Sequence, residues 1–152
     1  MKDNLVKTPK IIGFVSLLLL VMLIGSSALF AATLDTNSIV KGTIIEAFNQ
    51  DPKVQRDTAS GNMKVSPESF TNDTIDFLQK VSVYPLSLLG AALFLTLIGL
   101  ITMKFNRGIT AILFIIAGIA SLFTLIPAIL LFFAANKLFH KPEYTQPAVK
   151  KA

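Results

Sequence analysis

The stretch that decides the fold is residues 109–133, "ITAILFIIAGIASLFTLIPAILLFF", which has no charged residue and carries a proline at position 127. A bilayer core of roughly 30 Å is crossed by about 20 helical residues. Extended to residue 135, this run would measure about 40 Å as one tilted helix at about 1.5 Å per residue. Extended to residue 139, it supplies two helices of about 15 residues, below the usual lower limit of about 17. Its length does not decide between one helix and two.

The proline favours two helices. A proline in a first helical turn loses no hydrogen bond, because that N–H has no intrahelical partner. Thr124 stands just ahead of Pro127 and can cap the new helix. In the middle of one long helix the same proline would introduce a kink. We therefore expect a break near residues 124–126, between helices at 109–124 and 126–139.

Two further apolar runs are long enough to cross a membrane, residues 11–32 and residues 81–103. The first run also admits cleavage as a signal peptide, because "GSSA" at residues 25–28 offers small residues at a cleavage position. Its apolar stretch of about 20 residues is longer than the usual 7–15 of a signal sequence. The length favours a retained span.

The basic residues favour four spans with both termini in the cytoplasm. With two helices in the third run, nine of the 14 Lys and Arg residues lie on the side of the N-terminus, and five lie in residues 33–80. This is the excess that the positive-inside rule predicts for the cytoplasmic side. A three-span chain with its N-terminus outside has the same count, but it must translocate the basic head with Lys2, Lys7 and Lys10.

Residues 33–80 form the predicted extracytoplasmic segment. A cluster of capping residues at 35–38 followed by apolar residues at helical spacing predicts a short amphipathic helix. Residues 51–65 contain proline, glycine and polar residues without periodicity, and we expect a loop there. Ser66 as a cap and Pro67 as first helical residue predict a second helix that continues into the span at 81–103. The apolar faces of this segment either close the bundle or form a partner surface with Ile44, Phe48, Phe70 and Phe77.

The composition is that of a membrane protein, and the sequence shows no pattern of catalytic or ligand-binding residues. The chain has 152 residues, 53% of them hydrophobic, no cysteine and a net charge of +5, with a mean hydropathy of +0.65. Its positive residues flank apolar runs, which points to membrane topology rather than to nucleic acid. The apolar interiors contain no Asp, Glu, Lys, Arg or His. Transport of protons or charged substrates would normally need such residues at membrane depth. We find no catalytic, cofactor-binding or metal-binding pattern and expect no enzyme.

Small residues mark the expected helix contacts. Without a hydrophobic drive in lipid, small side chains at helical spacing allow helices to approach closely. Within the spans they are Ser87, Ala91, Gly99, Ala117, Gly118 and Ser121. We expect them to pack this bundle, and the alternative is binding of a second protein, either a membrane-protein partner or another copy of this chain.

The pieces "SPES" (66–69), "IIAGIASL" (115–122) and "NKLFHKP" (136–142) resemble small four-span membrane proteins of Gram-positive bacteria, grouped as domain-of-unknown-function family 4064. The resemblance implies the same four-span architecture and brings no known reaction. The chain departs from the pattern in lacking a glycine-containing spacer between its last two helices, near Leu125.

Together these patterns predict an all-α, integral membrane four-helix bundle formed by a single membrane domain of residues 1–152, with a cytoplasmic tail at 140–152. The expected function is that of a non-enzymatic, multi-pass cell-membrane protein that contacts the lipid bilayer. It would serve as a structural or accessory partner of an envelope, transport or stress-response complex. The alternative is an oligomeric pore or small-solute permease.

Overall fold

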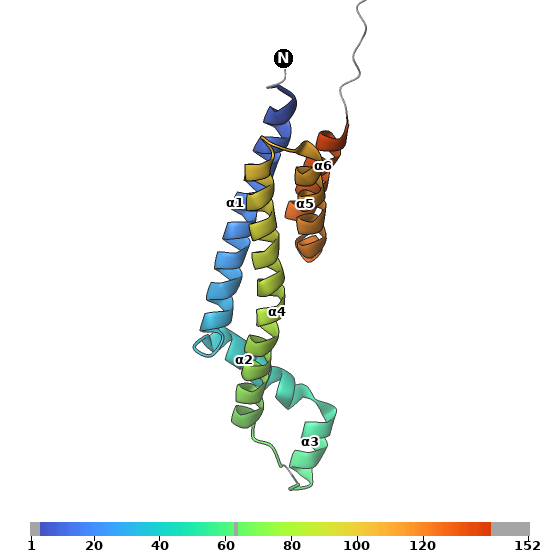
Figure 1. The fold of residues 1–152 in the computed structure, drawn as a ribbon. Helices are drawn as coiled ribbons and strands as arrows, with labels where there is room; N and C mark the ends of the chain where they lie inside the picture. Colours follow the sequence, from blue (N-terminus) through green and yellow to red (C-terminus); the bar gives the residue numbers. More distant parts are fainter. Residues whose placement is uncertain (1–3, 63, 141–152) are drawn as a thin grey trace, which may run out of the picture. The chain divides into compact units, whose positions relative to one another are not determined.

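The structure is a computed structural model that describes residues 4–62 and 64–140. Every regular element in these ranges is helical, which confirms the all-α prediction (Figure 1). In chain order they are α1 (Asn4–Thr33), α2 (Ser38–Gln50), α3 (Pro52–Ala59), α4 (Pro67–Thr102), α5 (Arg107–Ala120), the single 3-10 turn η1 (Leu122–Thr124) and α6 (Ile126–Phe139). All but His140 of the predicted tail lies outside the described residues.

Two helices in the described ranges are long and apolar enough to cross a membrane: Lys7–Thr33 within α1, and α4. The first contains the predicted run at 11–32, and α4 contains the predicted run at 81–103 except for its last residue, Met103. The predicted start of α4 is confirmed, because Pro67 is its first residue and the Ser66 hydroxyl accepts the Ser69 N–H at 3.1 Å. α4 continues from this polar beginning into its apolar part without a break.

The predicted amphipathic helix is α2, and Asn37 is the capping residue of its cluster. The Asn37 side-chain oxygen accepts the N–H groups of Ile39 at 3.0 Å and Val40 at 3.3 Å. These two bonds satisfy donors that have no partner inside the helix.

The loop predicted at 51–65 is wrong for its first part, which forms α3. The Asp51 carboxylate accepts the Lys53 N–H at 2.7 Å and caps a helix whose first residue is Pro52. The helix ends at Ala59 with Ser60 as its C-cap, and Gly61 follows with a φ of 71°. There the Asn62 N–H donates to the Asp57 carbonyl and the Gly61 N–H to that of Thr58, the paired bonds of a Schellman cap. Capping residues therefore form this helix despite its lack of apolar periodicity.

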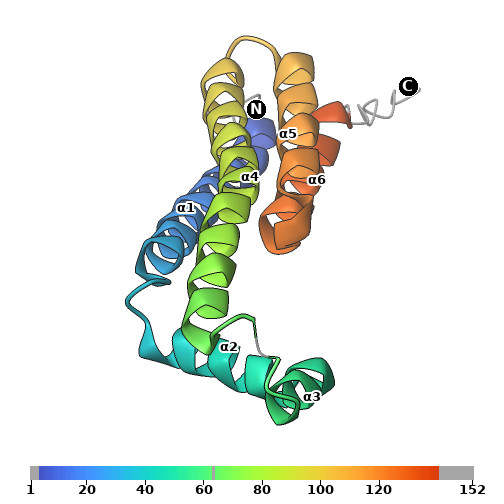
Figure 2. The same cartoon turned by 90° about the horizontal axis from the view of Figure 1, so that it is seen from below.

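The long apolar run is divided into α5 and α6, as Pro127 indicates (Figure 2). The prediction that Thr124 caps α6 is wrong. Leu125 holds the capping position, while the Thr124 hydroxyl donates to the Ser121 carbonyl at 2.6 Å. Leu125 has a φ of 56° and a ψ of −65°. This left-handed region favours glycine.

The contacts divide the chain into two units, the first made of residues 1–20 and 91–152. In its described part, α1, α4 and α5 meet at Phe114, whose ring is fully buried. A Cβ atom added to Gly13 would lie 2.9 Å from this ring, and one added to Gly99 would lie 2.6 Å from it. The ring thus occupies the space that two glycines leave open. α5 packs against α6 through Gly118 and the ring of Phe132, with the buried residues Ala117, Ala128, Leu131, Ala134 and Ala135.

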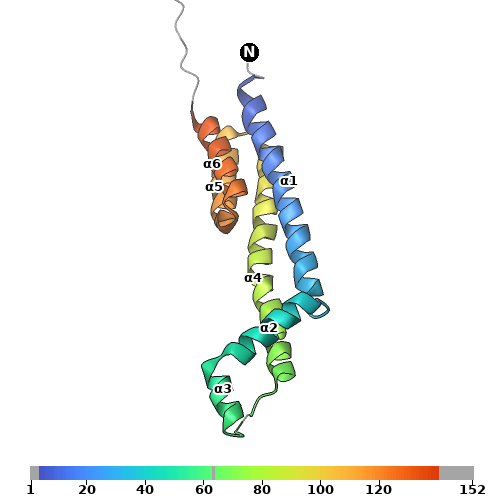
Figure 3. The same cartoon turned by 180° about the vertical axis from the view of Figure 1, so that it is seen from behind.

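The second unit is made of residues 21–90. Here the Gln79 side-chain amide donates to the Ala31 carbonyl at 3.4 Å, which places Gln79 of α4 level with the end of α1. Leu34 and Ile75, which are close to Ala31 and Gln79 in the sequence, are buried. Figure 3 shows the path of the intervening segment, in which α3 turns away from α2 before the chain returns to the start of α4.

Candidate functional site

The described residues of the second unit line a cavity of about 670 Å³ that opens to the surface. Four parts of the chain contribute to it: the end of α2, α3, the connection after α3, and the first turn of α4. Its lining residues are Phe48, Lys53, Val54, Asp57, Asn62, Lys64, Val65 and Phe70. The volume lies within the range of about 300–1,000 Å³ that is usual for binding pockets.

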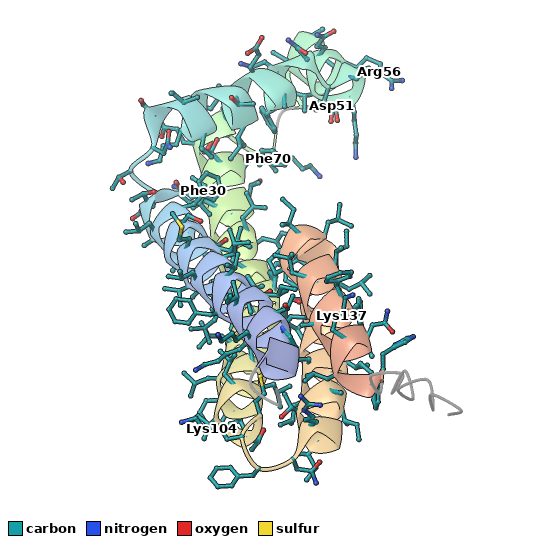
Figure 4. All side chains as sticks on the ribbon, turned by 90° about the horizontal axis from the view of Figure 1, so that it is seen from above. Phe30, Asp51, Arg56, Phe70, Lys104 and Lys137 are labelled. Atoms are coloured by element: carbon teal, nitrogen blue, oxygen red, sulfur yellow. The ribbon has the colours of Figure 1, made fainter. Side chains whose placement is uncertain are left out.

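An aromatic pair forms the apolar part of this cavity. The rings of Phe48 and Phe70 have centroids 4.8 Å apart and are tilted by 37°. Phe48 is 7% exposed and Phe70 is 39% exposed, so the pair is anchored on one side and open on the other. Figure 4 shows Phe70 on α4 beside α2. Such a pair offers a rigid apolar surface at low entropic cost.

Three charged side chains surround the aromatic pair. Lys53 and Lys64 are exposed and Asp57 is half-buried. None of the three forms an ion pair within the described residues. The two ammonium groups and the carboxylate are therefore free to contact a bound molecule. Asp51 and Arg56 of the same segment, labelled in Figure 4, do not line the cavity.

The structure brings together two of the four residues predicted as a partner surface. Phe48 and Phe70 meet in the cavity, whereas Ile44 and Phe77 do not line it. Phe77 is 63% exposed on α4, and Ile44 is half-buried on α2. The charged lining residues were missed because residues 51–65 read as a loop. The capping pair Asp51–Pro52 and the later Gly61 are the signals that would have identified α3.

The cavity combines an apolar surface with charged groups. An apolar surface with charged groups around it recognises a molecule that has both apolar and charged groups. In residues 4–62 and 64–140, no three His, Cys, Asp or Glu side chains lie close enough to hold a metal ion. The only histidine, His140, lies at the end of α6, where its ring bonds the Asn136 carbonyl.

The predicted helix-packing residues have different surroundings. Gly99, Ala117, Gly118 and Ser121 are buried in the first unit, and the two glycines lie against aromatic rings. Ser87 and Ala91 are exposed. A packing role for these two exposed residues stays a prediction.

No family model, no curated protein and no solved structure matches this chain. The resemblance to family 4064 accordingly stays a prediction.

Proposed function

We propose that the protein is a non-enzymatic, multi-pass protein of the cell membrane that serves as a structural or accessory partner of an envelope, transport or stress-response complex. The cavity with the Phe48–Phe70 pair and its unpaired charges is the observation that carries this proposal. It combines an apolar surface with free charged groups, which is the composition of a recognition site.

The membrane placement is supported by the faces of the long helices. Large apolar side chains are exposed on α1 and α4, including Met22 at 70%, Leu29 at 69% and Phe94 at 63%. Exposed apolar side chains of this size are stable in lipid and unfavourable in water. We place α1, α4 and the α5–α6 hairpin in the bilayer with both termini in the cytoplasm. If α5 and α6 both cross the bilayer completely, the chain has the four spans that the sequence predicts.

The cavity would then lie outside the cell, close to the membrane. Gln79 bonds the end of α1, and Phe70 lies nine positions earlier on α4. At about 1.5 Å per residue this is about 13 Å along the helix beyond the end of α1. A protein segment at the membrane surface is within reach of the site.

Photo-crosslinking in native membranes tests this function. A photo-reactive amino acid in place of Lys64 is compared with one in place of Gln55, which is exposed on α3 but does not line the cavity. We expect a crosslinked partner from position 64, its loss when Phe70→Ala is added, and no such partner from position 55. The proposal fails if only crosslinks between copies of this chain form and no other protein co-purifies. Conductance or solute uptake in vesicles with the purified chain would instead support the pore or permease.

A further inference from the structure

We propose that the α5–α6 hairpin is re-entrant and does not form the two complete spans of the four-span prediction. Its tip, residues 121–126, ends near the middle of the bilayer and contacts acyl chains there. This rests on the membrane placement proposed above. The α5 and α6 helices have 14 residues each, which is about 20 Å at about 1.5 Å per residue. A bilayer core of roughly 30 Å is deeper than either helix is long.

The contacts between α4 and α5 give the depth of the tip. The hydroxyl groups of Thr102 and Thr110 lie 3.2 Å apart. Gly99 lies against Phe114, so the two helices run antiparallel. Eleven residues beyond Thr110 is Ser121, and eleven residues before Thr102 is Ala91. The end of α5 is thus level with Ala91, which is the middle of the apolar run at 81–103.

The contacts with α1 lead to the same depth. Gly13 lies against both Leu100 of α4 and Phe114 of α5. Leu20, seven positions further along α1, is fully buried and is the last residue of α1 in this unit. Leu20 lies near the middle of the apolar run at 11–32. Ser121 lies seven positions beyond Phe114 on α5, so Leu20 of α1 and Ser121 of α5 lie about equally far from the Gly13–Phe114 contact, at about 1.5 Å per residue.

The tip has the chemistry of a hydrocarbon environment. Leu122, Phe123, Leu125 and Ile126 are between 52% and 66% exposed. No charged residue occurs between Arg107 and Lys137. At the opposite end of the hairpin, Arg107 is the first residue of α5. Lys137 lies in the last turn of α6, and Lys104 lies in the turn before α5 (Figure 4). A tip on the far side would expose four large apolar side chains to headgroups and water.

The turn also pairs many of its backbone groups, as a low-dielectric environment requires. The Ser121 hydroxyl donates to the Ala117 carbonyl at 2.9 Å. The Ser121 carbonyl accepts both the N–H and the hydroxyl of Thr124, and the Leu125 N–H donates to the Leu122 carbonyl. Pro127 removes one of the donors that a helix start leaves unpaired.

The absence of cysteine from the chain makes single-cysteine labelling a direct test. Asn72→Cys reports the extracytoplasmic segment, Phe105→Cys the turn before α5, and Phe123→Cys the tip. We expect a membrane-impermeant maleimide to label Asn72→Cys in intact cells and Phe105→Cys only after permeabilisation. Phe123→Cys is expected to stay unlabelled in both conditions and to react after the membrane is dissolved in detergent.

A spin label on Phe123→Cys in vesicles supplies a positive readout. We expect it to collide with oxygen and not with a water-soluble nickel complex, as a label at the bilayer centre does. Labelling of Phe123→Cys from outside in intact cells would overturn the re-entrant hairpin while leaving the membrane placement intact. Release of the whole chain from membranes by an alkaline carbonate wash would instead overturn the membrane placement itself.

Discussion

The Phe114 site allows a quantitative test of helix packing, because Gly99 and Gly90 both lie inside α4 but in different surroundings. In Gly99→Ala the new Cβ atom would lie 2.6 Å and 2.9 Å from two carbons of the Phe114 ring. In Gly90→Ala the new Cβ would meet no atom within 4 Å. The two variants make the same chemical change in the same helix, so the difference between them isolates the contact with the ring.

The expected magnitude follows from how little the ring can move. Ordinary contacts between carbon atoms are about 3.5–4.0 Å, so the ring would have to retreat by about 1 Å. Phe114 is fully buried, and Gly13 of α1 already lies close to its other carbons. Overpacking of this kind costs about 1–3 kcal/mol. Replacing glycine by alanine inside a helix returns up to about 1 kcal/mol at both positions, and this gain cancels in the comparison.

Denaturant titration in detergent micelles measures the free energy of unfolding of both variants, Gly99→Ala and Gly90→Ala. We expect Gly99→Ala to be less stable than Gly90→Ala by about 1–3 kcal/mol. Adding Phe114→Leu shortens the side chain that meets the new Cβ, so Gly99→Ala should cost less in that background than in the native one. Equal stability of Gly99→Ala and Gly90→Ala would refute the close contact, as would a cost unchanged by Phe114→Leu.

Three further predictions concern the turn and the cavity. Leu125→Gly should raise the free energy of unfolding by about 1 kcal/mol because glycine adopts a positive φ without strain, whereas Leu122→Gly should lower it; the same titration measures both. Asp51→Ala removes the cap of α3 and should increase amide exchange in Pro52–Ala59 with little change in α2, and equal exchange in the native chain and the variant would contradict this cap. Phe70→Ala should abolish partner crosslinking from position 64 without releasing the chain from membranes, and unchanged crosslinking would remove the aromatic pair from the site.

Local signals in the sequence were sufficient for much of the fold. Pro127 indicated the division of the apolar run, and Ser66 with Pro67 indicated the start of α4, because both features depend on one helical turn. α3 was missed because it has caps but no apolar stripe, and apolar periodicity was the criterion applied. The wrong cap at Thr124 has another cause. A hydroxyl can bond a carbonyl of the preceding turn instead of the next helix, and this choice depends on three-dimensional geometry.

The candidate site was predictable only in part. Helical spacing identified Phe48 and Phe70 as members of apolar faces, but it did not indicate that these two rings would meet. Ile44 and Phe77 belong to the same periodic patterns and do not line the cavity. Periodicity defines a face of a helix, whereas the contact between two helices depends on the connection that joins them.

The contact of Phe114 with Gly13 and Gly99 bears on the order in which the helices assemble during synthesis. Gly13 and Gly99 both precede Phe114 in the sequence, and they lie on two different helices. The ribosome therefore releases both glycine-bearing helices before it releases Phe114. If α5 docked while either glycine-bearing helix was missing, one side of the ring would lack its contacts. We therefore expect the hairpin to dock last, on a pair of α1 and α4 that leaves an open space at Gly13 and Gly99 until Phe114 arrives.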